Sequence, residues 1–240
     1  MATGPADSRP VLVLWDVDHT LIENNGVNKE TYAKAFEILT GRPAEHPAET
    51  EGRTEPDIVA NMLAMHGIDS NYVDLSAMAE ALQSATLSNV PHLRERGHIL
   101  PGAREALEAL QQAPGIVQSV LTGNLKPNAI AKLAGFGLNV YVDFEVGGYG
   151  SDDRVRANLV EVARRRAQAK FGITLGKSTT VVIGDTPRDV QAGRQGGAYM
   201  VAVASGSDSV SRLAEAGADL VFPDLQDTQA LVKAVTSLQA

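Results

Sequence analysis

The sequence predicts an α/β protein, built as a doubly wound, mostly parallel, Rossmann-like sheet with one all-helical domain inserted into it. Three observations lead to this expectation. Short apolar runs recur along the chain, helical patterns lie between most of them, and one long segment after the first run carries helical patterns only. Strands that alternate with helices are typical of a parallel sheet covered on both faces.

The expected strands are continuous apolar runs that end at a polar or turn-forming residue. The first, 11–15, lies between Pro10 and Asp16, and such a run suits a strand buried on both faces. Similar runs predict further strands at 116–121, 140–146, 179–183, 199–204 and 220–222.

The expected helices separate these strands. The segment 101–113 has Pro101 near its start and repeats alanine and leucine at helical spacing, so that one face is apolar. Comparable patterns predict helices at 127–134, 155–171, 187–195, 208–216 and 228–238.

One segment, 25–97, breaks the alternation because it contains no convincing strand. Its helical patterns lie at 29–39, 55–66 and 74–94. We therefore expect a core domain formed by 11–24 and 98–240, a separate helical domain at 25–97 and a short flexible lead at 1–10. The chain crosses between the two domains near 23–26 and 97–101, where we expect hinges.

Composition excludes several classes of protein. The 240 residues include 29 acidic and 21 basic ones, a formal charge of −8, whereas a nucleic-acid-binding surface needs a basic face. The absence of cysteine excludes disulfides, thiolate nucleophiles, iron–sulfur clusters and cysteine zinc sites. No apolar run approaches the length of about 18 residues that a membrane span needs, and 1–10 has no signal-peptide core, so we expect a cytoplasmic protein.

Polar residues follow the expected strands at the positions where ligands bind. In an open α/β sheet, ligands bind beyond the carboxyl ends of the strands. The residues at these ends are Asp16, Thr122, Asp185, Ser205 and Asp224.

Two of these strand ends carry pairs of aspartates. Asp16 and Asp18 are two residues apart, so an extended backbone points both side chains the same way. Asp189 lies four residues after Asp185, in the first turn of the helix expected to begin at Pro187. If the two strands are neighbours, the carboxylates converge and raise each other's pKa or bind a cation. Oxygen ligands alone favour Mg²⁺ over zinc or copper.

A simpler interpretation exists for each aspartate alone, since a single aspartate at a strand end is usually a turn residue or a helix cap. Two pairs, together with Thr122-Gly123-Asn124 at a third strand end, are much harder to explain in this way.

These residues resemble the motifs of the haloacid dehalogenase superfamily. Asp16-Val17-Asp18-His19-Thr20 resembles the first motif, DxDxT, and Leu121-Thr122-Gly123-Asn124 resembles the second. The segment 182–189 resembles the fourth, GDxxxD, and order and spacing agree over 11–225. The helical insert lies where the phosphoglycolate-phosphatase-like members carry a helical cap.

The resemblance implies a role for each residue. Asp16 would be the nucleophile that forms an aspartyl-phosphate, and Asp18 the general acid for the leaving oxygen and then the base for water. We expect the anionic neighbours to raise the pKa of Asp18 for this purpose. Thr122, helped by the backbone amides of Gly123 and Asn124, would bind the phosphoryl oxygens.

The metal site also follows from the resemblance. Asp16, Asp185 and the carbonyl oxygen of Asp18 would hold Mg²⁺, and Asp189 would support the metal through water or from behind its ligands.

The third motif of the family, a lysine or arginine, has no clear counterpart. Lys126-Pro127 matches by letter but follows the second motif too closely. Arg156, just before a helical run, is the preferred candidate, and Arg154 is the second.

Two further positions have an open interpretation. Gly52-Arg53-Thr54 resembles a specificity loop of the cap, and Arg53 could bind a substrate carboxylate or phosphate, although an ordinary exposed arginine is an equally good interpretation. His19 stands where the family often has glycine, and we expect no catalytic role for it.

The leading hypothesis is a magnesium-dependent phosphatase acting on a small phosphomonoester, similar to the phosphoglycolate phosphatases. Asp18 argues against a dehalogenase or a phosphonatase, which resemble this chain otherwise but lack that residue. A sugar phosphomutase has both aspartates and remains an alternative, although Thr20 mildly favours a phosphatase. A non-catalytic regulatory or binding protein on the same fold is the second alternative.

Overall fold

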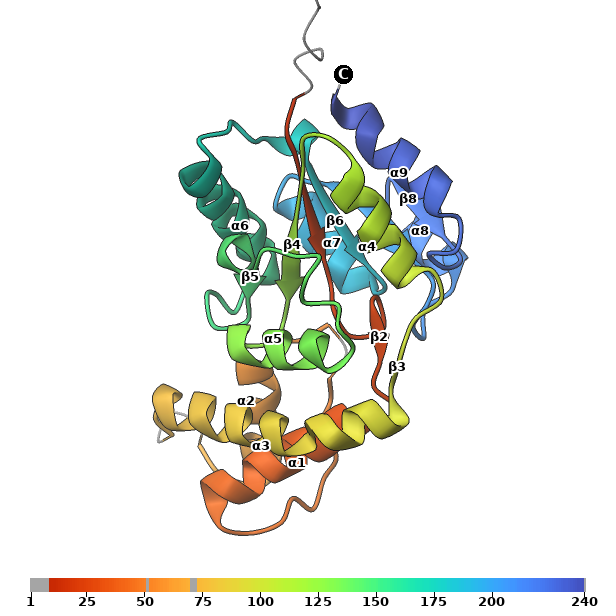
Figure 1. The fold of residues 1–240 in the computed structure, drawn as a ribbon. Coiled ribbons are helices and arrows are strands. Elements are labelled where there is room, and N and C mark those ends of the chain that lie inside the picture. The colour runs from red at the N-terminus through yellow and green to blue at the C-terminus, as the bar shows by residue number, and fades with distance from the viewer. Residues whose placement is uncertain (1–8, 51, 70–72, 240) are drawn as a thin grey trace, which may run out of the picture.

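The structure, a computed structural model, describes residues 9–50, 52–69 and 73–239, so most of the expected lead at 1–10 lies outside the described residues. A six-stranded parallel sheet in the order β5-β4-β1-β6-β7-β8 forms its centre (Figure 1). The strands are β1 (Val11–Trp15), β4 (Ile116–Thr122), β5 (Gly148–Tyr149), β6 (Thr180–Gly184), β7 (Tyr199–Val203) and β8 (Leu220–Phe222).

Helices cover both faces of the sheet, which confirms the predicted fold class. Along β1, residues 11, 13 and 15 pack toward α4 (Ala103–Gln112), α5 (Lys126–Gly135) and α9 (Thr228–Thr236). Residues 12 and 14 pack on the other face against α6 (Arg156–Phe171), α7 (Pro187–Gln195) and α8 (Val210–Glu215). The continuous apolar sequence of β1 thus reflects burial on two sides.

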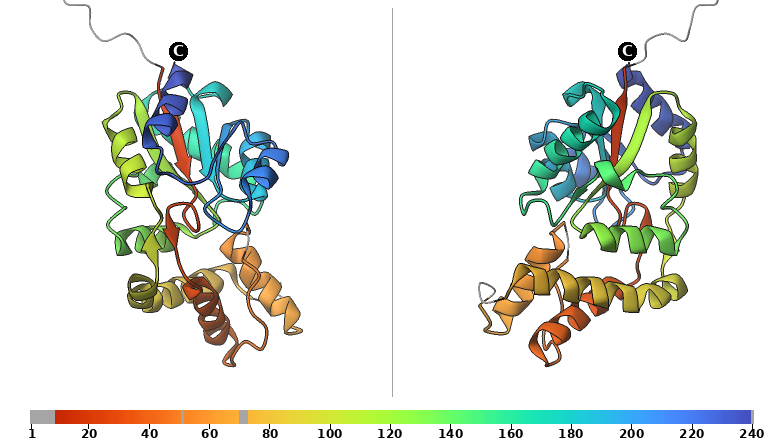
Figure 2. Two further views of the ribbon diagram at one scale, coloured as in Figure 1. Left: turned by 90° about the vertical axis from the view of Figure 1, so that its right-hand side faces the viewer. Right: turned by 60° about the vertical axis from the view of Figure 1, so that its left-hand side comes forward.

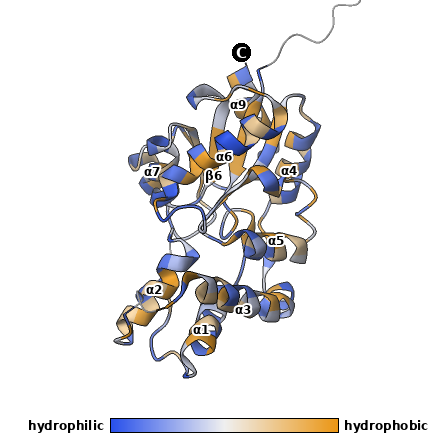
Figure 3. Ribbon diagram, turned by 90° about the vertical axis from the view of Figure 1, so that its left-hand side faces the viewer, coloured by the Kyte–Doolittle hydropathy of each residue, from blue (hydrophilic) through white to orange (hydrophobic). Residues whose placement is uncertain are grey.

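The inserted helical domain consists of α1 (Val27–Thr40), α2 (Glu55–Met65) and α3 (Leu75–Arg96), which lie below the sheet in both views of Figure 2. It has a hydrophobic core of its own that includes Phe36, Met62 and Leu82, and Figure 3 shows hydrophobic segments along α1 and α2. Where the chain leaves and re-enters the sheet domain, β2 (Ile22–Glu23) pairs antiparallel with β3 (His98–Ile99).

One predicted strand is wrong. The segment 140–146 forms no strand, because Val140 is 64% exposed and Asp143 begins a short 3-10 helix, Phe144–Val146. The Asp143 side chain accepts a hydrogen bond from the backbone N–H of Glu145 and so stabilises that turn. The strand follows at β5, and the apolar composition of the run reflects the burial of Val142 and Val146 and the packing of Tyr141 and Phe144 against the core.

Every predicted helix is present, with both ends within two residues of the expected positions. The first turn of several helices is marked in the sequence, as at Thr54, Thr186 and Asp227, whose side chains accept a hydrogen bond from a backbone N–H three residues later. None of the helices in the described ranges is both long and apolar enough to cross a membrane.

Candidate functional site

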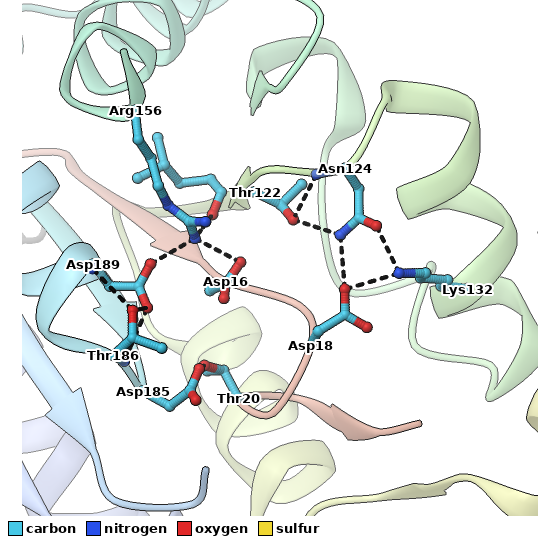
Figure 4. Close-up of polar contacts among 11 residues, drawn as sticks. Asp16, Asp18, Thr20, Thr122, Asn124, Lys132, Arg156, Asp185, Thr186 and Asp189 are labelled. Carbon is cyan, nitrogen blue, oxygen red and sulfur yellow. Dashed lines mark hydrogen bonds and ion pairs between the residues drawn. The ribbon is translucent and has the colours of Figure 1, made fainter. Parts of the chain in front are cut away.

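Three aspartates meet where the neighbouring strands β1 and β6 end (Figure 4). Asp16 follows β1 directly and Asp185 follows β6, and the pairing of Trp15 with Ile183 places their side chains at the same edge of the sheet. Oxygens of Asp16, Asp185 and Asp189 lie within 4.8 Å of one another. We call these three residues the acidic cluster.

Asp189 is fixed by the start of α7. Its Oδ2 accepts hydrogen bonds from the N–H of Thr186 at 3.0 Å and from Thr186 Oγ1 at 2.6 Å, while Thr186 Oγ1 accepts from the N–H of Asp189. This reciprocal pair is a capping box, which turns the carboxylate back toward the strand end. A Cβ on Gly184 would lie only 2.7 Å from Asp189, so a glycine is needed there.

Arg156 is the cation of the acidic cluster. It is the first residue of α6, and one guanidinium nitrogen lies 2.8 Å from Asp16 Oδ1 and 2.6 Å from Asp189 Oδ1. Its side chain is only 10% exposed. Arg154 instead is 64% exposed and lies 3.8 Å from Asp57, and Lys126 pairs with Glu145 at the surface. Of the three candidate cations, Arg156 therefore contacts the aspartates.

The acidic cluster carries more negative charge than Arg156 neutralises. Burial, opposed by Arg156 and aided by Asp189 and Asp18, raises the pKa of Asp16 to about 7. Burial and the charges of Asp189 and Asp16 likewise hold the pKa of Asp185 well above its ordinary value. The expectation that these carboxylates raise each other's pKa is confirmed for both residues, and a divalent cation bound by their oxygens would relieve the repulsion.

Asp18 lies on the other side of the site and behaves in the opposite way. Its Oδ2 accepts hydrogen bonds from Lys132 Nζ at 2.8 Å and Asn124 Nδ2 at 3.0 Å. Burial alone would raise the pKa of Asp18, but the charge of Lys132 and the hydrogen bonds from Lys132, Asn124 and Asn28 lower it to about 2. The expectation that anionic neighbours raise this pKa is therefore wrong, because a buried lysine outweighs them.

The loop after β4 brings a third strand end to the site. Thr122 Oγ1 accepts hydrogen bonds from Asn124 Nδ2 at 2.7 Å and from the N–H of Asn124 at 3.3 Å. A Cβ on Gly123 would lie 2.1 Å from the carbonyl oxygen of Arg53, so only glycine permits this approach of the helical insert.

A cavity of about 300 Å³ connects these groups. The sheet domain contributes Asp16, Asp18, Thr122, Gly123, Asn124, Arg156 and Asp185 to its lining, and the insert contributes Asn28, Lys29, Tyr32, Gly52 and Arg53 among others. Asp189 is buried behind the lining, and the guanidinium of Arg53 pairs with Glu49 at 3.0 Å.

His19, for which no catalytic role is expected, lines the cavity, and its ring pairs with Glu23 at 2.8 Å. Its φ of 60° lies in the left-handed region, which explains why glycine suits this position. Ser205 donates a hydrogen bond to the His19 carbonyl oxygen, and Asp224 accepts from Gln226, so neither side chain is part of the cavity lining.

Two buried charged residues near the site, Lys132 and Glu55, were not predicted from the sequence. Lys132 is 3% exposed, and its spacing from Ala129 and Leu133 puts it on the buried face of α5. A lysine within an apolar stripe is a signal that the sequence offered. Glu55 is 1% exposed at the start of α2, where an acidic residue is ordinary, so its sequence gave no comparable signal.

Comparisons with known proteins agree with this geometry. Residues 13–194 match the family of haloacid dehalogenase-like hydrolases, and a search of curated proteins finds no match. Similar solved structures include a hydrolase from Pseudomonas syringae, with 20% identity and a TM-score of 0.66, covering 94% of this chain and 99% of that one.

Two other similar structures have more specific names. A predicted phosphoglycolate phosphatase from Haemophilus somnus is 16% identical with a TM-score of 0.63, covering 95% of this chain and 100% of that one. A proposed β-phosphoglucomutase from Bacteroides vulgatus is 19% identical with a TM-score of 0.64, covering 98% of this chain and 92% of that one. At these identities the likeness shows a shared fold.

Proposed function

Since the chain belongs to the haloacid dehalogenase-like hydrolases, we propose that it is a magnesium-dependent phosphatase that hydrolyses a small phosphomonoester. One observation carries this proposal. The carboxylate of Asp16 faces a cavity between the acidic cluster on one side and the Thr122 loop on the other. A nucleophile between a cation site and hydrogen-bond donors is the arrangement that phosphoryl transfer requires.

The metal assignment is supported by the chemistry of the donors. Asp16 and Asp185, with the carbonyl oxygen of Asp18, would hold Mg²⁺. Asp189 would contact the ion through water or would contact the residues that bind it. Hard carboxylate oxygens within 4.8 Å of one another, with raised pKa values at Asp16 and Asp185, suit a small divalent cation. When bound, the ion would withdraw negative charge from the phosphoryl oxygens.

The first step is attack by a carboxylate oxygen of Asp16 on phosphorus, which breaks the bond to the leaving oxygen and forms an aspartyl-phosphate. Arg156 keeps Asp16 oriented at 2.8 Å. Thr122 and the amides of Gly123 and Asn124 would stabilise the phosphoryl oxygens, since fixed donors need no reorganisation during the reaction.

The second step is attack by water on the aspartyl-phosphate, which releases inorganic phosphate and regenerates Asp16. Asp18 takes the proton from that water. Its pKa of about 2 keeps it ionised, the state that a general base needs. Asp18 gives a proton to the leaving oxygen in the first step and regains one from water in the second, so the cycle balances. Because Lys132 keeps Asp18 ionised in the free protein, the acid role requires that the anionic substrate raise its pKa.

The helical insert would act as a cap over this chemistry. It supplies one side of the cavity lining, and Arg53 in that lining would bind an anionic group of the substrate. A cap that closes over the cavity would exclude bulk water and leave only the productive attack.

Phosphate release from a panel of small phosphomonoesters, with and without Mg²⁺, tests the proposal. We expect magnesium-dependent turnover that Asp16→Asn abolishes. A folded protein with no turnover on any panel member would favour the non-catalytic alternative. Isomerisation of a sugar phosphate, primed by its bisphosphate and with little phosphate release, would instead indicate a phosphomutase.

A further inference from the structure

Glu55 of the helical insert reaches into the sheet domain and binds the loop that follows β4. Its backbone N–H donates to the carbonyl oxygen of Gly123 at 2.7 Å. Its Oε2 accepts from the N–H of Leu125 at 2.8 Å and from Asn128 Nδ2 at 2.7 Å. One residue of the insert therefore holds the residues on both sides of Asn124.

These contacts fix the direction of two consecutive peptide groups. In a trans peptide the C=O and the N–H point to opposite sides, and the described chain has no cis peptide. With the Gly123 carbonyl turned to Glu55, the N–H of Asn124 points the other way, toward Thr122 Oγ1. In the next peptide, Glu55 holds the N–H of Leu125 while the N–H of Gly150 donates to the Asn124 carbonyl at 3.0 Å.

The packing around the loop permits this docking at close range. Leu125, the residue at the start of α5, is 4% exposed and belongs to the hydrophobic core of the insert. It provides no side-chain cap for α5, and the carboxylate of Glu55 binds the N–H of Leu125, the group that an N3 side chain would bind in a capping box. A Cβ on Gly150 would lie 2.1 Å from the Gly123 carbonyl oxygen, which leaves the loop little room for another path.

We propose that Glu55 is a positioning residue, through which docking of the insert sets the two peptide groups on either side of Asn124 and so directs the Asn124 N–H to the Thr122 side of the loop, where a phosphoryl group would bind. The inference rests on the proposed function, because the Asn124 amide is there assigned to the phosphoryl oxygens. The loop then acquires its donor geometry only with the insert in place, which couples closure over the substrate to catalysis.

The charges around Glu55 fit a contact that forms and breaks with docking. Burial raises its pKa to about 7, against the lowering effects of Lys132, Leu125 and Asn128, and Asp18 adds to the rise. Together with burial, the charge of Glu55 also raises the pKa of Tyr32 of α1. The carboxylate is costly to bury when ionised, and it is held by only two hydrogen bonds, both from neutral donors to Oε2, so the docked contact is one that can open.

Glu55→Ala tests the inference, with Glu80→Gln, an exposed carboxylate of α3, as the matched control. We expect amide hydrogen exchange at 123–129 to rise at least about tenfold, with α9 unchanged, because the side-chain hydrogen bonds to the loop are lost. Binding of inorganic phosphate in the presence of Mg²⁺, measured by calorimetry, should weaken about fivefold or more, and kcat should fall about tenfold. Unchanged exchange at 123–129 in a folded Glu55→Ala protein would overturn the inference.

If Glu55→Ala destabilises the whole protein, a pair of variants at 55 and 128 tests the positioning role instead. Asn128→Asp puts a second carboxylate beside Glu55 and should open the contact, raising exchange at 123–129 and weakening phosphate binding. Adding Glu55→Gln restores a donor and acceptor pair with their roles exchanged, and both readouts should return toward wild type. Failure of that restoration would contradict the positioning role. Exchange needs no turnover, so a wild-type protein without phosphatase activity would refute the proposed function while still testing Glu55.

Discussion

Asp16 and Asp18 stand two residues apart in one loop and are the same type of residue, the first buried and the second half-buried, yet their pKa values are displaced in opposite directions. That of Asp16 is raised to about 7 and that of Asp18 is lowered to about 2. The difference comes from the cations. Arg156 is shared by Asp16 and Asp189, with Asp185 close by, whereas Lys132 is within hydrogen-bond distance of Asp18 alone among the described carboxylates.

This contrast divides the site into two regions with different tasks. In the proposed function, the acidic cluster, which is short of positive charge, would accept a metal ion and supply Asp16 as the nucleophile. The region around α5 contains its own cation and hydrogen-bond donors, and it would hold an ionised base and the phosphate-binding loop. Burial alone does not explain the opposite pKa shifts of Asp16 and Asp18. The number of carboxylates that share each cation explains them.

Asp16→Asn should give the largest effect, because it removes the proposed nucleophile, which belongs to the acidic cluster. We expect phosphate release to fall by at least about 10³-fold while the fold is retained, since removing a nucleophile leaves only binding and electrostatic effects. The measurement is kcat on the best substrate of the panel, with circular dichroism to verify folding.

Asp224→Asn is the matched control for this experiment, because Asp224 also follows a strand of the sheet but lies outside the cavity lining. It should retain full activity. Activity of the Asp16→Asn protein within tenfold of wild type would disprove the covalent mechanism.

Lys132→Met tests the other region. It leaves the half-buried Asp18 without its cation, and breaking an ion pair whose lysine is buried costs on the order of 3 kcal/mol of unfolding free energy. Urea denaturation should show this loss, and the pKa of Asp18 should rise. The double variant Asp18→Asn with Lys132→Met should recover part of the stability, because the uncompensated charge is then gone.

Lys126→Met supplies the comparison on the same helix. Its ion pair with Glu145 is exposed, so the loss should stay below about 1 kcal/mol. Equal losses of unfolding free energy for Lys132→Met and Lys126→Met would mean that the ion pair of Lys132 with Asp18 stabilises the protein no more than an exposed pair does.

Addition of Mg²⁺ should distinguish the two regions directly. At about 100 times its dissociation constant the ion would add roughly 2.7 kcal/mol of stability, a rise in Tm of about 5–10 °C for a chain of this size. Asp185→Asn should be more stable than wild type without metal, because it relieves repulsion, and should lose the response to Mg²⁺. Asp18→Asn should retain most of the response, and a full response in Asp185→Asn would exclude the acidic cluster as the metal site.

The sequence predicted the fold and the acidic cluster because both follow from local patterns. The apolar strands and their helices follow from periodicity, and the aspartates converge because β1 and β6 are neighbours, the condition on which that prediction depended. The strand predicted at 140–146 is absent because apolar composition indicates burial and not backbone conformation. Spacing indicates that Lys132 is buried, but the partners of Lys132 and Glu55 could not be predicted from local patterns, because they lie 114 and 70 residues away in the chain.

Glu55 completes the comparison as a buried carboxylate of the α5 region with only neutral hydrogen-bond donors, and it predicts a dependence of stability on pH. Its pKa is raised from 4.5 to about 7, chiefly by burial. Its folded-state contribution is therefore fully present below pH 4.5 and is lost as the pH rises through about 7. Glu55→Gln carries no titrating group there, so wild type should lose stability relative to this variant between pH 5 and 8, by on the order of 2 kcal/mol.

Thermal unfolding of wild type, Glu55→Gln and the exposed control Glu80→Gln across this pH range measures the difference. Acidic-cluster residues titrate in all three proteins, so their effect cancels in the comparison with the control. A gap between wild type and Glu55→Gln that grows with pH, and no gap between wild type and Glu80→Gln, would show that the insert docks more firmly with Glu55 protonated. A gap of constant size would mean that Glu55 keeps an ordinary pKa, and that the hydrogen bonds at Leu125 and Asn128 compensate fully for its burial.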